Sequence, residues 1–180
     1  MNATTLREHL ARLDAALGEP ARLCIYGSAA LMLMGEEDRF SLDIDVAGSY
    51  SVVSERTLAT AAQQIGLPIN PPEHFTGDHI EWVGPGRLCL ANPTPEGTVV
   101  LWQGSRLTVL TVPAPDLVAS KLIRYDPTDQ ADIQFLVANC RVRFEDIAQA
   151  ADRLPAPFRD DALVRENLKN LQRDLQRWTP

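Results

Sequence analysis

Apolar side chains recur every three or four positions over residues 4–17, which predicts a helix. Its buried face would be formed by Leu6, Leu10, Leu13 and Leu17. Gly18 and Pro20 predict its end. Short alternating runs predict strands over residues 23–26, 42–46, 79–83, 87–91, 98–102 and 106–112, with helices over 29–34 and 54–65. The Pro- and Gly-rich segment 71–104 favours antiparallel strands and hairpins.

After Pro113 the pattern changes to that of helices, predicted over residues 116–125, 128–139, 144–152 and 158–178. The last of these carries an apolar stripe of Val164, Leu168, Leu171, Leu175 and Trp178. The stripe would pack on the body of the protein or on a second subunit, as a homodimer. The fold class predicted is α/β (α+β), with a small mixed sheet flanked by helices over residues 1–113 and a helical region over 114–180.

The composition predicts a soluble, cytoplasmic protein. Charged residues break up the first 20 positions, and no apolar run approaches the roughly 20 residues that cross a bilayer. The cysteines Cys24, Cys89 and Cys140 stand far apart in apolar settings, as small core residues do. We therefore expect neither a membrane segment nor a disulfide framework.

The net charge of −7 argues against a broad nucleic-acid-binding surface. Residues 1–90 carry 6 Lys and Arg against 12 Asp and Glu, so the cations gather in the second half. That distribution is typical of a solvated helix surface, and a local stripe that contacts RNA is the alternative.

The candidate metal- and phosphate-binding residues lie within residues 26–46. Asp43 and Asp45 would lie about 7 Å apart on one face of a strand, where they repel each other unless a cation lies between them. Mg²⁺ suits such a pair, because it binds carboxylates together with phosphate oxygens. Gly27 and Ser28 stand where a strand turns into a helix, and backbone N–H groups at such a turn can hold a phosphate.

A Gly-Ser turn followed by an Asp-x-Asp strand resembles the nucleotidyltransferase superfamily, the DNA polymerase β-like fold. The nearest likeness is to small bacterial AbiEii/MenT-like proteins, several of which are toxins of toxin–antitoxin pairs. It covers residues 23–46 and, more loosely, 114–137. The resemblance implies that Asp43 and Asp45 hold Mg²⁺ (or Mn²⁺) and that Gly27 and Ser28 bind the β- and γ-phosphates of a nucleoside triphosphate such as ATP. Ser41 could tune the metal strand through its hydroxyl, or make a structural hydrogen bond.

A second cluster is predicted in the C-terminal half. Lys121 falls inside an apolar helix face, where an ammonium needs an anion, and Asp129 and Asp132 border the apolar stripe of the next helix. In the resembled family a lysine on such a helix contacts the triphosphate and a later aspartate supports the reaction, which implies catalytic Asp132 with Asp129 behind it. The alternative is a structural ion pair between two helices, and Asp129 also fits the first turn of a helix capped by Asp126.

Many members of the superfamily add a third carboxylate from a later strand. The strand 106–112 carries none, and Glu81 is interpreted as an acid on a strand surface. Two functions therefore stay open. One is a Mg²⁺-dependent nucleotidyltransferase whose acceptor is RNA, protein or a small molecule. The other is a silent module of the same fold that binds nucleotide or protein, for example an antitoxin-like partner.

Overall fold

The computed structural model describes residues 1–94 and 97–178, and it confirms the mixed α/β class. The chain divides into two compact units. Met1–Leu88 and Thr98–Thr111 form the first unit, and Cys89–Gly97 and Val112–Pro180 form the second. The chain thus leaves the first unit after Leu88 and returns to it at Thr98 before it enters the second unit again.

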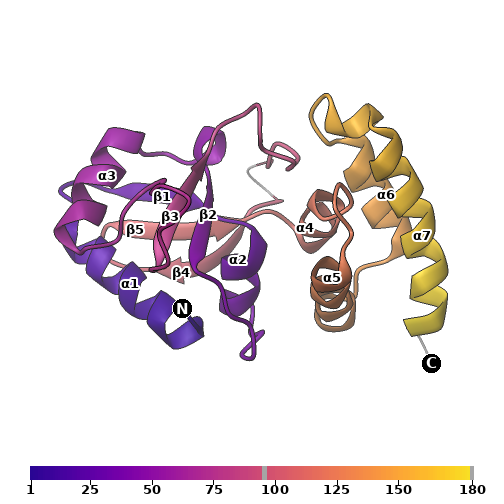
Figure 1. The fold of residues 1–180 in the computed structure, drawn as a ribbon, viewed down its shortest axis with the longest axis horizontal. Coiled ribbons are helices and arrows are strands. Elements are labelled where there is room, and N and C mark those ends of the chain that lie inside the picture. Colours follow the sequence, from indigo (N-terminus) through magenta and orange to yellow (C-terminus); the bar gives the residue numbers. More distant parts are fainter. Residues whose placement is uncertain (95–96, 179–180) are drawn as a thin grey trace. The chain divides into compact units, whose positions relative to one another are not determined.

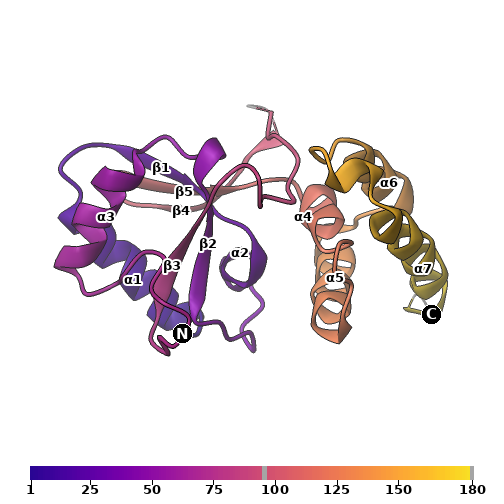
Figure 2. The ribbon, with the colours of Figure 1, turned by 45° about the horizontal axis from the view of Figure 1, so that its top comes forward.

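The first unit contains the predicted strands and the N-terminal helices (Figure 1). Its elements are α1 (Ala3–Ala16), β1 (Ala21–Cys24), α2 (Gly27–Leu33), β2 (Asp43–Ala47), the 3₁₀ turn η1 (Gly48–Tyr50), α3 (Glu55–Gln64), β3 (His79–Val83), β4 (Val99–Gln103) and β5 (Leu107–Thr111). Figures 1 and 2 show α1 and α3 side by side along one side of the sheet. The four leucines expected on the inner face of α1 are each at most 1% exposed.

The strands form two small sheets. In one, β1 pairs in parallel with β5, and β5 pairs antiparallel with β4. In the other, β2 and β3 pair in parallel, with Asp43 opposite His79 and Asp45 opposite Glu81. An isolated antiparallel bridge between Ile25 and Val46 joins the two sheets. This bridge places the end of β1 directly beside the Asp-x-Asp strand.

Two expectations for the middle of the chain were wrong. The strand 79–83 forms, but it pairs in parallel with β2 rather than in a hairpin. Residues 87–91 form no strand: Arg87 closes a turn through its N–H to the Gly84 carbonyl (3.1 Å), and the chain then passes into the second unit at Cys89. The apolar residues Leu88 and Leu90 are buried although neither lies in a strand. Burial alone explains their pattern.

From Ala114 on, the described residues of the second unit form helices joined by short connections. Its elements are α4 (Ala114–Ser120), α5 (Pro127–Cys140), α6 (Phe144–Asp152), the 3₁₀ turn η3 (Phe158–Asp160) and α7 (Ala162–Trp178). α4 is shorter than predicted, because the chain turns after Ser120 and reverses at Tyr125, whose φ is +55°. The helix predicted over 158–178 breaks at Asp161, whose carboxylate accepts the N–H of Leu163 (2.8 Å).

The apolar stripe of α7 is largely used inside the second unit. Val164 and Leu171 are fully buried, while Leu168, Leu175 and Trp178 are half-buried. Leu175 also lines a groove with residues at the end of α5 and the start of α6. Packing within the chain therefore accounts for the centre of the stripe, and a homodimer through α7 stays a prediction.

The cysteines are only partly placed as expected. Cys24 and Cys89 are buried, as expected, but Cys140 is exposed at the end of α5, so its assignment to the core was wrong. All three thiols are free. Among the helices of the described residues, none combines the length and the apolar character needed to span a bilayer.

Candidate active site

Three carboxylates meet on one face of the β2–β3 pair. Alternation along β2 puts Asp43 and Asp45 on the same face, and the parallel register places Glu81 beside Asp45. Oxygens of Asp43, Asp45 and Glu81 all lie within 4.8 Å of one another, and all three residues are half-buried. Glu81, interpreted from the sequence as a surface acid, thus lies beside the Asp-x-Asp pair and could supply the third carboxylate.

The cluster is electrostatically costly without a cation. Two full charges at 4.8 Å repel by about 3 kcal/mol at an effective dielectric constant of about 20. Two partners relieve part of this repulsion. The hydroxyl of Ser41 donates a hydrogen bond to Asp43 Oδ1, and Arg87 Nη2 lies 2.6 Å from Glu81 Oε1. The predicted contact of Ser41 with the metal strand is thus a direct hydrogen bond to Asp43.

The Gly27 turn lies against Asp45. The backbone N–H of Tyr26 donates to the carbonyl of Asp45 (3.1 Å), which continues the bridge between Ile25 and Val46. Gly27 follows with φ +64°, a conformation that favours glycine. A Cβ on Gly27 would lie 2.3 Å from Asp45 Oδ2, so only glycine leaves room for that carboxylate. The predicted Gly-Ser turn and the predicted Asp-x-Asp strand are therefore in contact.

Ser28 is held by a cation that the sequence pattern did not reveal. Arg39, in the loop between α2 and β2, donates from Nε (3.1 Å) and Nη2 (2.9 Å) to the hydroxyl of Ser28. Arg39 is half-buried. A guanidinium fixed beside the Gly-Ser turn adds positive charge where the resemblance places phosphate.

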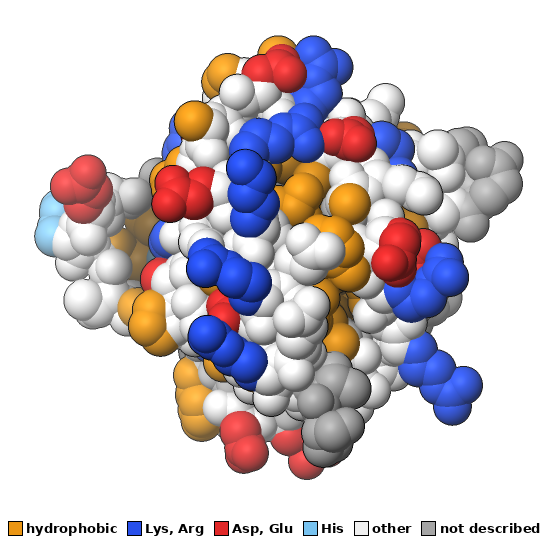
Figure 3. Space-filling model, turned by 90° about the vertical axis from the view of Figure 1, so that its right-hand side faces the viewer, with side chains coloured by type: hydrophobic (Ala, Val, Ile, Leu, Met, Phe, Trp, Pro, Cys, Tyr) orange, Lys and Arg blue, Asp and Glu red, His pale blue; other side chains and the backbone are white. Residues whose placement is uncertain are grey.

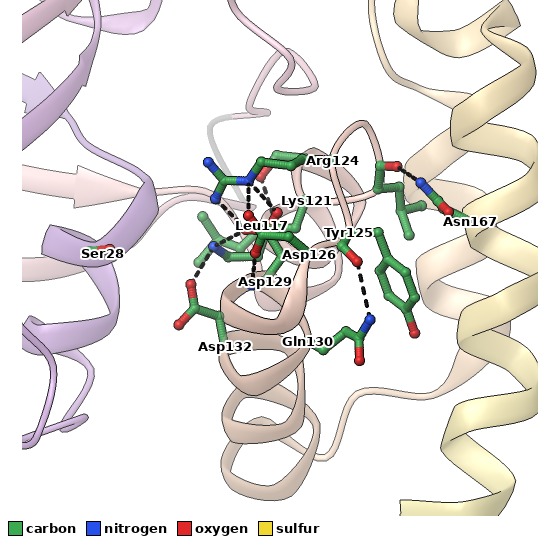
Figure 4. Close-up of polar contacts among 12 residues, drawn as sticks. Ser28, Leu117, Lys121, Arg124, Tyr125, Asp126, Asp129, Gln130, Asp132 and Asn167 are labelled. Atoms are coloured by element: carbon green, nitrogen blue, oxygen red, sulfur yellow. Dashed lines mark hydrogen bonds and ion pairs between the residues drawn. The ribbon is translucent and has the colours of Figure 1, made fainter.

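The second predicted cluster lies in the second unit, and its members contact one another (Figure 4). Lys121 is 9% exposed, and its Nζ lies 2.6 Å from Asp132 Oδ2 and 3.3 Å from Asp129 Oδ1. Arg124 binds both oxygens of Asp129, at 2.8 and 2.9 Å. The hydrogen bond with Asp129 is the main cause that raises the pKa of Arg124 above its usual value. This is the structural ion pair named above as the alternative.

The local reason for this cluster is the helix start at Pro127. Asp126 caps α5 by accepting the N–H of Asp129 (2.9 Å), which fixes the Asp129 carboxylate in the first turn. One helical turn further on, Asp132 is fully buried. A contact of Lys121, Asp129 or Asp132 with a nucleotide stays a prediction.

The cations of α7 form a row. Arg165, Lys169, Arg173 and Arg177 follow one another at steps of four, and Figure 3, which views the side of α6 and α7, shows Lys and Arg side chains in a file. Arg165 pairs with Asp152 (2.8 Å) and Arg177 with Asp174 (3.3 Å). These pairs favour the interpretation of a solvated helix surface.

Comparison with known families decides the class of the protein. Residues 4–167 match the model of a family described as nucleotidyltransferase of unknown function (DUF6036). The chain belongs to this family. No curated protein and no solved structure matches it. Membership in the nucleotidyltransferase family confirms the general resemblance and the expectation of an enzyme.

The triad of this nucleotidyltransferase suits a hard divalent cation. Its donors are all oxygens, as Mg²⁺ prefers, and half-burial leaves room for water and phosphate to complete an octahedron. Oxygens on opposite sides of Mg²⁺ lie about 4.2 Å apart, so carboxylates within 4.8 Å need only small side-chain adjustments to share an ion. Asp43, Asp45 and Glu81 could therefore hold the metal that the family implies.

Replacement of Gly27 by alanine tests the contact between the turn and Asp45. Gly27→Ala should weaken Mn²⁺ binding at least about tenfold by calorimetry, because the new Cβ displaces the Asp45 carboxylate. Gly66→Ala is the matched control, since Gly66 has φ +71° with nothing within 4 Å of its Cβ position. Both variants should lose about 1–2 kcal/mol of stability from backbone strain. Wild-type Mn²⁺ affinity in Gly27→Ala would refute the contact.

Removal of Lys121 tests whether its ion pairs stabilise the second unit. Lys121→Met should lower the free energy of unfolding by about 3–5 kcal/mol in urea titrations, because it leaves Asp132 buried without its cation. Lys169→Met, on an exposed lysine of α7, should change it by less than about 0.5 kcal/mol. The double variant Lys121→Met/Asp132→Leu should recover part of the loss. Wild-type stability with weakened MgNTP binding would instead favour the phosphate contact.

Proposed function

We propose that this protein is a Mg²⁺-dependent nucleotidyltransferase that transfers a nucleoside monophosphate from a nucleoside triphosphate to an acceptor hydroxyl. The observation that carries the proposal is the meeting of Asp43, Asp45 and Glu81 within 4.8 Å, beside the Gly27 turn. A phosphate-binding turn in contact with a metal-binding carboxylate set is what handling a triphosphate requires.

Asp43 and Asp45 would hold the metal, and Glu81 would complete the set from β3. When bound, Mg²⁺ supplies charge neutralisation on the triphosphate and on the leaving pyrophosphate. The backbone at Gly27 and Ser28 would receive the β- and γ-phosphates. Arg39, fixed on the Ser28 hydroxyl, would add a cation next to them. The half-buried position of these groups limits the screening of their charges by water.

In the reaction, the acceptor oxygen forms a bond to the α-phosphorus while the bond from that phosphorus to the bridging oxygen of the β-phosphate breaks. Pyrophosphate leaves with the electrons of that bond. Glu81 would accept the proton of the acceptor hydroxyl; its carboxylate adjoins Asp43 and Asp45 and borders a pocket, which supports this role. Positioning and electrostatic stabilisation supply the rate, as for phosphoryl transfer in general.

The biological setting is a further part of the proposal. The likeness to AbiEii/MenT-like proteins favours a toxin of a toxin–antitoxin pair, and a small antitoxin-like reading frame beside the gene would support it. A silent module was favoured by the missing third carboxylate, and Glu81 removes that argument. We therefore place the enzyme first and protein association second.

Calorimetry with each of the four nucleoside triphosphates and Mg²⁺ tests the proposal. Wild-type protein should bind at least one with micromolar affinity, and Asp43→Asn/Asp45→Asn should bind it at least about a hundredfold more weakly, because the neutral amides cannot hold the metal. Asp38→Asn, which changes an exposed acid in the loop before β2, should leave the affinity unchanged.

Addition of EDTA should abolish binding to the wild-type protein. Absence of binding to all four nucleotides by a folded wild-type sample would refute the enzyme. Equal affinity in the double variant would refute the assignment of the site.

A further inference from the structure

A pocket of about 400 Å³ opens in the first unit beside β3. Its volume is that of a small-molecule site. Glu81 belongs both to its lining and to the carboxylate triad. A molecule bound in the pocket therefore lies against the carboxylate that we assign to the acceptor hydroxyl.

One wall of the pocket carries two aromatic rings, while Asn70 and Glu73 make other parts of its lining polar. Phe75 meets the ring of His79 edge-on, with ring centres 5.9 Å apart and planes at 86°, and Pro71 and Pro72 extend this surface. Phe75 is 38% exposed, so its ring is accessible to a ligand. Gly77 leaves it room, because a Cβ there would lie 2.7 Å from Phe75 Cζ. A planar ring can stack on such a wall.

Arg87 closes the pocket on the side of Glu81. It comes from the turn that follows β3, and its Nη2 lies 2.6 Å from Glu81 Oε1. The Arg87 side chain is 73% exposed, so the pair is screened by water and holds weakly. A divalent ion on the triad would compete for the same carboxylate and displace the guanidinium.

We propose that this pocket is the acceptor site, and that Arg87 moves from Glu81 to an anionic group of the acceptor when the triad holds its metal. The ligand class is a nucleotide. Its planar base would stack on Phe75 and His79, its phosphate would bind the fork-shaped guanidinium of Arg87, and its hydroxyl would face Glu81. The nucleotide is either free or the end of an RNA chain. This inference rests on the proposed function, because it needs the metal-binding triad.

The first arm of the test measures Mn²⁺ affinity by calorimetry without nucleotide. Arg87→Ala should bind Mn²⁺ about two- to fivefold more tightly than wild type, because the competitor for Glu81 is gone. Arg87→Lys keeps the charge and should stay near wild type. Equal or weaker binding in Arg87→Ala would overturn the competition between arginine and metal.

The second arm measures acceptor binding with Mg²⁺ and a non-hydrolysable triphosphate at saturation. The probes are nucleoside monophosphates and RNA trinucleotides that end in the same bases. Phe75→Ala and Arg87→Ala should weaken probe binding at least about tenfold, and Arg87→Lys should weaken it less, while triphosphate affinity stays within about twofold. Tighter binding of the trinucleotide identifies an RNA end, and equal binding a free nucleotide.

Three results would overturn the inference. Loss of triphosphate affinity in Phe75→Ala would mean that the pocket holds the base of the donor. If the protein binds the triphosphate but none of the monophosphates or trinucleotides, a nucleotide acceptor is excluded and the proposed function stays intact. Failure of wild-type protein to bind Mn²⁺ or triphosphate would remove both proposals.

Discussion

The parallel pairing of β2 with β3 is the constraint on which the site depends. One face of this pair is apolar, with Ile44, Val46 and Ile80 at most 1% exposed. Burial of these side chains fixes the register, since a slip by one residue would turn them to solvent. The same register places Asp45 opposite Glu81 on the other face. Hydrophobic burial thus holds three carboxylates together against their mutual repulsion.

The second constraint is the bridge that ties the two sheets. Tyr26 donates its N–H to Asp45, and Gly27 can then approach the Asp45 carboxylate because it has no Cβ. The turn, the Asp-x-Asp strand and the cations Arg39 and Arg87 all belong to the first unit.

Patterns with a short period were readable from the sequence, and pairings distant along the chain were not. Alternation alone put Asp43 and Asp45 on one face, and helical spacing brought Lys121 to Asp129 and Asp132. The position of Glu81 depends on a parallel partner 36 residues away in the register, which no local pattern encodes. The strand predicted over residues 87–91 was wrong because a buried irregular segment and a short strand can have the same apolar composition.

The most direct measurement is a crystal structure of the protein grown with Mn²⁺ and a non-hydrolysable nucleoside triphosphate, with anomalous scattering to locate the metal. Mn²⁺ should lie between Asp43, Asp45 and Glu81, with phosphates at Gly27 and Ser28 and with Arg87 released from Glu81. Mn²⁺ bound at another site, with the pair of Arg87 and Glu81 intact, would show that the triad is not the metal site.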